Sequence, residues 1–186
     1  MKLIFAAASL IALSVTAASA TEVMGMGTPS DVQFRQKALS SDAFEIASSK
    51  IALNNATDES VKSFARMMIR DHTKTTDKLV ALGAISKDSI EAKMATGPDG
   101  KYPSNDLFST MQASELNSLA AKSNDDFNKT YMDDQVSGHK DAVSLMQDYA
   151  KNGDNAKLKS FASEVLPKVQ EHLSKAQALD DTLNKK

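Results

Sequence analysis

The chain has 186 residues, a formal net charge of −2, no cysteine and no tryptophan. This length is enough for one domain with a sizeable core, and the lack of cysteine excludes a disulfide framework, so stability must come from packing. The small net charge and the absence of a basic patch argue against nucleic acid as a partner. Few glycines and prolines, with many alanines, leucines and lysines, favour an all-α protein.

The first 20 residues have the pattern of a secretory signal peptide. Lys2 is the basic start, residues 3–17 are apolar and small, and the A-S-A at 18–20 is a cleavage site, so the mature chain is predicted to begin at Thr21. No later stretch approaches the roughly 20 apolar residues of a spanning helix. We therefore expect a periplasmic or secreted protein with no transmembrane segment in its mature form.

A flexible leader is predicted first, followed by the first long helix and its turn. Pro29 and Ser30 are start signals for this helix, Ser40 and Ser41 mark a candidate break in it, and Asp58 is the expected N-cap of the next. The leader covers residues 21–30, and the four long predicted helices cover residues 31–55, 59–84, 125–151 and 155–183.

The long segment between the second and third of these helices has weak periodicity. Residues 86–106 are expected to form a connection with at most a short helix near 88–95, and a short helix is predicted near 107–121. Ser123 and Asp126 have the spacing of a capping box, and Gly153 is the expected C′ residue of the third long helix. Two helical hairpins joined by a long crossover predict an antiparallel four-helix bundle, with one domain over residues 31–184.

Each of the three histidines lies in the middle of the apolar stripe of a different long helix. They are His72, His139 and His172, and Glu45 holds a similar place on the remaining long helix. At about 100° per residue, apolar neighbours fall on the same side as each of these residues, so three imidazoles and one carboxylate are predicted to point at the bundle axis. Counting from the turns places His172 a turn or more away from the others, which weakens the prediction of one compact site.

Two interpretations of this pattern stay open. Neutral imidazole and carboxylate are good ligands for Zn, Fe, Mn or Cu, so Glu45, His72, His139 and His172 are candidate ligands of one transition metal ion. Alternatively they form a buried polar network that fixes helix register without a ligand, since a histidine on an apolar face is usually a satisfied core residue.

Further polar residues lie close to these positions in the sequence. Tyr131 and Gln135 precede His139 on its helix and are predicted to support the ligands from behind. Asp71 and Glu171 are expected to point sideways, toward solvent or a neighbouring helix. No nucleophile motif, G-x-S-x-G turn or phosphate-binding glycine loop is visible, so no catalytic residue is predicted and a non-enzymatic role is favoured.

Several blocks of sequence together resemble the exported bacterial family called domain of unknown function forty-one forty-two. These blocks are FEIA at 44–47, VKSFARMMIRDH at 61–72, DF at 126–127 with Tyr131, QVSGH at 135–139, and LKSFA at 158–162 through LP at 166–167 to HL at 172–173. The resemblance covers about residues 31–180. It implies a ferritin-like four-helix bundle and no established biochemical function.

The ferritin comparison has a chemical limit. Di-iron sites of ferritin-like proteins use Glu-x-x-His on two helices and a glutamate on each of the others. Here Ile69 stands three residues before His72, and Val169 stands three residues before His172. The bridging carboxylates are therefore missing, and a mononuclear site is the metal site that these residues still allow.

The sequence thus predicts an exported helical-bundle protein with a non-enzymatic role in the envelope or in stress tolerance. The alternative hypothesis is a protein that binds one transition metal ion, which is either redox-active or inert. A third hypothesis is a carrier of a small apolar molecule. An envelope protein or a second copy of the chain is the expected kind of partner.

Overall fold

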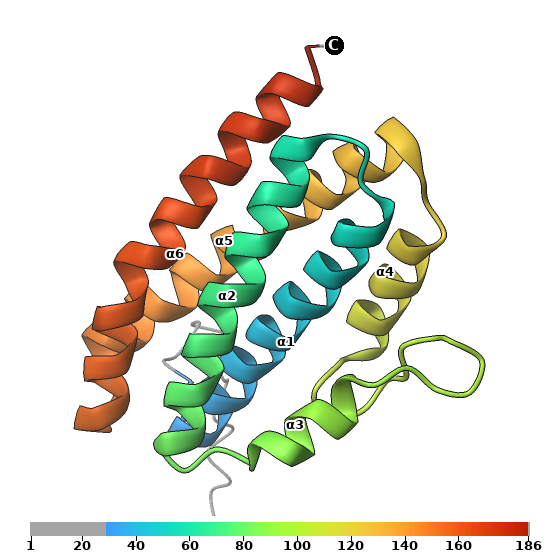
Figure 1. The fold of residues 1–186 in the computed structure, drawn as a ribbon. Helices are drawn as coiled ribbons and strands as arrows, with labels where there is room; N and C mark the ends of the chain where they lie inside the picture. The colour runs from blue at the N-terminus through green and yellow to red at the C-terminus, as the bar shows by residue number, and fades with distance from the viewer. Residues whose placement is uncertain (1–28, 186) are drawn as a thin grey trace, which may run out of the picture.

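A computed structural model describes residues 29–185, and within that range the protein is all-helical (Figure 1). The all-α prediction is confirmed. The predicted signal peptide and the leader up to residue 28 lie outside the described residues. The helices are α1 (Asp31–Asn55), α2 (Glu59–Ala81), α3 (Lys87–Met94), α4 (Thr110–Ala120), α5 (Asn124–Asn152) and α6 (Ala156–Leu183). Within this part of the chain, no helix combines the length and the apolar character that a membrane crossing requires.

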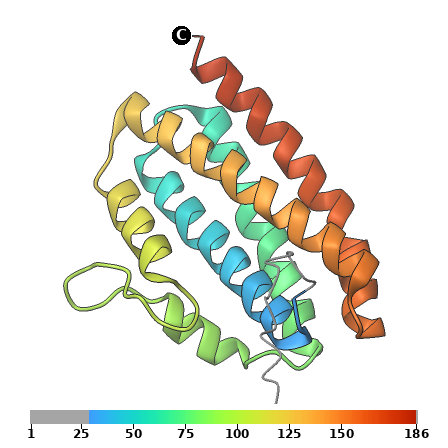
Figure 2. The ribbon, with the colours of Figure 1, turned by 180° about the vertical axis from the view of Figure 1, so that it is seen from behind.

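The four long helices contact one another in the cyclic order α1, α2, α6, α5. Packing is most extensive within the α1–α2 hairpin and within the α5–α6 hairpin. The connection between α2 and α5 carries α3 and α4, which lie along α1 on the side away from α6, as the two opposite views show (Figures 1 and 2). Both short helices expected in this connection are present, although α4 begins at Thr110 rather than near residue 107.

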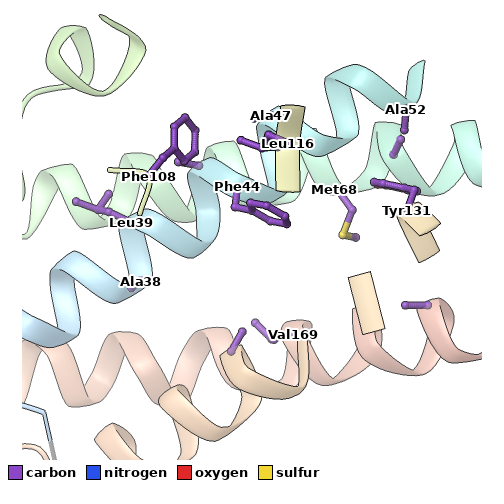
Figure 3. Packing of buried hydrophobic residues seen from close by; sticks show 14 of the residues in the cluster. Ala38, Leu39, Phe44, Ala47, Ala52, Met68, Phe108, Leu116, Tyr131 and Val169 are labelled. Carbon is purple, nitrogen blue, oxygen red and sulfur yellow. The ribbon is translucent and has the colours of Figure 1, made fainter. Parts of the chain in front are cut away.

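Helix α1 is the central helix of the protein. Residues 42–49 are all buried, so this stretch has no solvent-facing side. Small residues such as Ala38 and Ala47 let neighbouring helices approach α1 closely. Figure 3 shows Leu39, Phe108 and Leu116 in the same apolar cluster. A polar side chain in this stretch must therefore find its partners inside the protein.

Most predicted helix starts are confirmed by their capping contacts. Ser30 accepts a hydrogen bond from the backbone N–H of Gln33, whose side chain accepts one from the N–H of Ser30. Asp58 caps α2 by accepting from the N–H of Ser60 at 2.8 Å. These contacts satisfy N–H groups that a helix start leaves free. The break expected at residues 40–41 is wrong, because α1 is continuous.

Two local predictions need correction. Ser123 makes no capping bond: Asn124 adopts a left-handed φ of 56°, and Asp126 pairs with Lys122 at 2.8 Å. Gly153 does end α5, but as the cap itself and in an extended conformation with φ −63°. Glycine is needed there because a Cβ atom would lie 2.5 Å from the ring of Tyr149. Residue 153 is glycine because an aromatic ring lies too close for a side chain, and not because the backbone is left-handed there.

Candidate metal centre

The structure brings all three histidines together in the middle of the protein. His72 comes from α2, His139 from α5 and His172 from α6, and their ring centroids are 5.5–5.6 Å apart. One ring nitrogen of each lies within 4.8 Å of the others. All three side chains are buried, with at most 4 % of any residue exposed.

The expectation that His172 lies a turn or more from the other histidines is wrong. His172 is further than His139 from the turn between α5 and α6. However, helical side chains lean toward the N-terminus of their own helix. In this antiparallel pair His172 leans back toward the turn and His139 leans away from it, so the two rings converge.

Each imidazole uses one nitrogen in a hydrogen bond on the outer side of the cluster. His72 Nδ1 lies 2.8 Å from Asp42 Oδ1, His139 Nδ1 lies 2.8 Å from the carbonyl oxygen of Gln135, and His172 Nε2 lies 3.2 Å from Asp71 Oδ2. These three contacts fix the orientation of the rings.

The partners of His139 and His172 also determine where the ring protons lie. A carbonyl oxygen only accepts, so His139 Nδ1 carries its hydrogen and Nε2 presents a lone pair. A side-chain bond from Arg70, the strongest of several influences, lowers the pKa of Asp71 to about 2. The ionised Asp71 therefore accepts from His172 Nε2, which leaves a lone pair on Nδ1.

The Asp42–His72 pair is more deeply buried. Burial raises the pKa of Asp42 well above its ordinary value and lowers the pKa of His72 to about 4. Thr76 donates a hydrogen bond to the second oxygen of Asp42 at 3.2 Å. When Nδ1 of His72 donates to Asp42 in the hydrogen bond between them, the Nε2 atom of His72 presents a lone pair as in the other two rings.

The inner nitrogens lack hydrogen-bond partners. Within residues 29–185, His72 Nε2, His139 Nε2 and His172 Nδ1 are buried and make no hydrogen bond. Burial also lowers the pKa of His172 to about 4, so this ring is neutral at pH 7. Three imidazoles thus direct nitrogens without hydrogen-bond partners into one buried space, and imidazole nitrogens are ligands that a transition metal ion takes.

Glu45, the fourth predicted ligand, is buried but lies outside the three-histidine group. Its Oε1 atom is 3.7 Å from Nδ1 of His139, the nitrogen on the outer side of that ring, and its Oε2 has no hydrogen-bond partner in the described chain. A Cβ atom on Gly138 would lie 3.0 Å from Oε1, so this glycine leaves room for the carboxylate. A ligand role for Glu45 stays a prediction.

The two predicted supporting residues behave differently. Gln135 contacts His139 through its backbone carbonyl, and its side chain donates to Ser48 at 3.4 Å. The hydroxyl of Tyr131 instead lies 2.8 Å from that of Ser49. Both therefore belong to a polar layer beside Glu45, and only Gln135 contacts an imidazole.

Sequence reasoning missed Asp42 and left the direction of Asp71 open. Asp71 reaches the neighbouring helix, where it contacts His172, rather than facing solvent. Asp42 stands three residues before Glu45, on nearly the same side of α1. This Asp-x-x-Glu spacing, on a helix rich in alanine and serine, is the sequence feature that could have identified Asp42 as a buried residue near Glu45.

The geometry allows a metal ion with open coordination positions. A tetrahedral ion about 2.0–2.1 Å from each nitrogen sets the nitrogens about 3.3 Å apart. The observed limit of 4.8 Å is wider, so the rings would draw inward on binding. Three protein ligands leave at least one position for water or another small ligand.

Comparison with known proteins gives one match. The family model described as a domain of unknown function (DUF4142) matches residues 15–179, which agrees with the resemblance noted in the sequence. No curated protein and no solved structure gives a significant match. The chain belongs to the DUF4142 family.

Proposed function

We propose that this protein binds one transition metal ion through His72, His139 and His172. The observation that carries the proposal is the convergence of three buried ring nitrogens that make no hydrogen bond in the described structure. A buried polar atom left without a partner costs about 1–3 kcal/mol. A bound ion would satisfy all three nitrogens at once.

The outer contacts of the rings support the same function. Metal-ligating histidines almost always donate their other N–H to a carboxylate or a backbone carbonyl, which fixes the tautomer and increases ligand basicity. Asp42, Gln135 and Asp71 supply these two kinds of acceptor. The carboxylate of Asp71, whose pKa is lowered to about 2, also places negative charge near the position of a divalent cation.

The ligand chemistry selects a class of metal. Neutral imidazole suits Zn, Cu, Fe and Ni, whereas Mg and Ca prefer sets of oxygen ligands. Mn, which favours carboxylate ligands, would need Glu45 to join the set. No carboxylate oxygen lies in the three-histidine group of the described chain.

The proposal extends to fold and location. The cyclic contacts of α1, α2, α6 and α5 support a ferritin-like four-helix bundle formed by residues 31–184 as one domain. The pattern of residues 1–20 supports export to the periplasm or beyond. An exported metal-binding protein fits a role in the envelope or in stress tolerance without requiring catalysis.

A second candidate function is a polar core that fixes helix register and binds no metal. The observation that favours it is that hydrogen bonds already join α1 to α2 through Asp42 and His72, and α2 to α6 through Asp71 and His172. Such buried contacts select one arrangement of helices in some proteins. This function leaves the three inner nitrogens unexplained.

Elemental analysis of protein purified without an affinity tag or a chelator tests the proposal. We expect about one equivalent of a transition metal per chain, lost in His72→Ala. Tyr131→Phe is the matched control, because it removes a buried hydroxyl that contacts Ser49 and no imidazole. If the native protein holds no metal and takes up none on titration with Zn, Fe, Mn and Cu, the polar-core function stands instead.

A further inference from the structure

A surface groove lies between α4 and α5. It has a volume of about 690 Å³, and its lining includes the apolar residues Met111 and Leu119. The lining also includes hydroxyl side chains and two carboxylates, Glu115 and Asp134. Burial, followed by the negative charge of Glu115, raises the pKa of Asp134 to about 6. The groove therefore carries two neighbouring carboxylates, and the positive charge of Lys122 offsets part of their negative charge.

Glu45 lies against the stretch of α5 that follows Asp134. Gly138 is one helical turn after Asp134 on α5, so the two residues share a side of the helix. Oε1 of Glu45 lies against Gly138, which is only half-buried and has no side chain. No side chain of residue 138 therefore covers Oε1 of Glu45. Its other oxygen, Oε2, is buried and has no hydrogen-bond partner within the described residues.

The charge of Glu45 affects the pKa of Asp134 in the groove and the pKa of His72 in the histidine cluster. Behind the larger effects of burial, Glu115 and Asp133, it contributes to the raised pKa of Asp134. On the other side it opposes the lowering of the His72 pKa that burial causes. Glu45 is also 3.7 Å from the ring of His139. Its carboxylate is therefore close both to Asp134 of the groove and to His139 of the histidine cluster.

We propose that Glu45 is a transient cation-binding residue on the route by which metal ions pass from the α4–α5 groove to the three histidines. This inference rests on the proposed metal function and adds to it an uptake route. Carboxylates attract the hydrated cation to the groove, as focused negative charge raises the rate of association. Glu45 then receives the ion through its Oε2 atom, which is buried and makes no hydrogen bond within the described residues. Three converging imidazoles hold a borderline metal better than one carboxylate, so the ion moves on.

Stopped-flow uptake of Co(II), followed by its visible absorption, tests this route. Glu115→Gln combined with Asp134→Asn should slow uptake about 3- to 10-fold at low ionic strength, and the difference should shrink as salt is added. The matched control is Asp181→Asn, which removes an exposed carboxylate from α6, outside the groove. The amount of Co(II) bound at equilibrium should be the same in all of these proteins.

Two interior variants sharpen the test. Gly138→Leu should slow both uptake and release, because its side chain would cover the position of the Glu45 carboxylate. Glu45→Gln should slow uptake without changing the final Co(II) spectrum. A changed final spectrum would make Glu45 a permanent ligand and overturn the transient role.

The results separate the two proposals. If native protein binds no Co(II) and no other transition metal, the proposed function fails. If Co(II) binds, and the groove double variant and Glu45→Gln both take it up at the rate of the Asp181→Asn control, the route is wrong and the metal site stands. The surface double variant keeps the route testable even if Gly138→Leu does not fold.

Discussion

Asp42 and His72 are joined across two helices, with Oδ1 of the aspartate 2.8 Å from Nδ1 of the imidazole. Both side chains are at most 6 % exposed. Thr76 donates to the second carboxylate oxygen, so the aspartate is held at both oxygens. The contact directs the other nitrogen of His72 toward His139 and His172. A residue on α1 therefore positions a candidate ligand on α2.

Removing this support should weaken metal binding. Asp42→Ala is expected to reduce affinity about 10- to 100-fold, the usual effect of losing a carboxylate that orients a ligating histidine. Competition for Zn(II) against a chromophoric chelator measures the change. Asp181→Asn, which replaces an exposed carboxylate on α6, should leave affinity unchanged. Equal affinities for Asp42→Ala and the native protein would show that the Asp42 contact does not serve the site.

Replacing individual histidines should have unequal effects on the metal-free protein. His172→Leu removes a buried nitrogen that makes no hydrogen bond, and Asp71 keeps its bonds to Arg70, so stability should change by less than about 1 kcal/mol. His72→Leu leaves the buried Asp42 with Thr76 alone and should cost about 3–5 kcal/mol. Urea denaturation in the presence of a chelator measures both. Similar losses in the two variants would contradict the asymmetry between Asp42 and Asp71.

The His172 contribution to stability should depend on pH with a defined sign. Its pKa falls from 6.5 to about 4 on folding, with burial the main cause. Below pH 6.5 the unfolded chain therefore takes up a proton that the folded chain does not. Relative to His172→Leu, the metal-free native protein should lose up to about 3 kcal/mol of stability between pH 6.5 and pH 4. The difference should be constant outside this window, and a flat difference inside it would show that His172 protonates in the folded state.

Gly153→Ala should destabilise the turn between α5 and α6. The added Cβ atom would lie 2.5 Å from the ring of Tyr149, which stacks on Phe34 with ring centroids 3.9 Å apart. Overpacking of this kind costs about 1–3 kcal/mol. Thermal unfolding measures the loss, and Asp154→Ala at the exposed neighbouring position is the control. An unchanged melting temperature in Gly153→Ala would show that Tyr149 can move aside at no cost.

Much of the fold could be predicted from local sequence signals. Ser30 and Asp58 mark helix starts because their side-chain oxygens satisfy free N–H groups, and the structure confirms both. The periodicity of apolar residues around His72, His139 and His172 placed all three inside. These inferences depend on neighbours within a few turns, which a single sequence displays directly.

The rest depended on how separate helices fit together. His139 and His172 converge because side chains on two antiparallel helices lean in opposite directions. Counting residues from the turn ignores this lean. Asp42 was overlooked because residues 42–49 of α1 are all buried, so polar residues in this stretch do not separate into inner and outer faces. Ser123 failed as a cap because Asn124 takes a left-handed conformation and Asp126 pairs with Lys122 instead.

The division of the chain into two hairpins has a consequence for reassembly. His72 and its partner Asp42 belong to the α1–α2 hairpin, whereas His139 and His172 belong to the α5–α6 hairpin. The connection between the hairpins includes an exposed loop around Gly100. If the chain were cut in this loop, neither fragment would carry three imidazoles. The two fragments would need to recombine before the site could form, so metal occupancy would report fragment complementation.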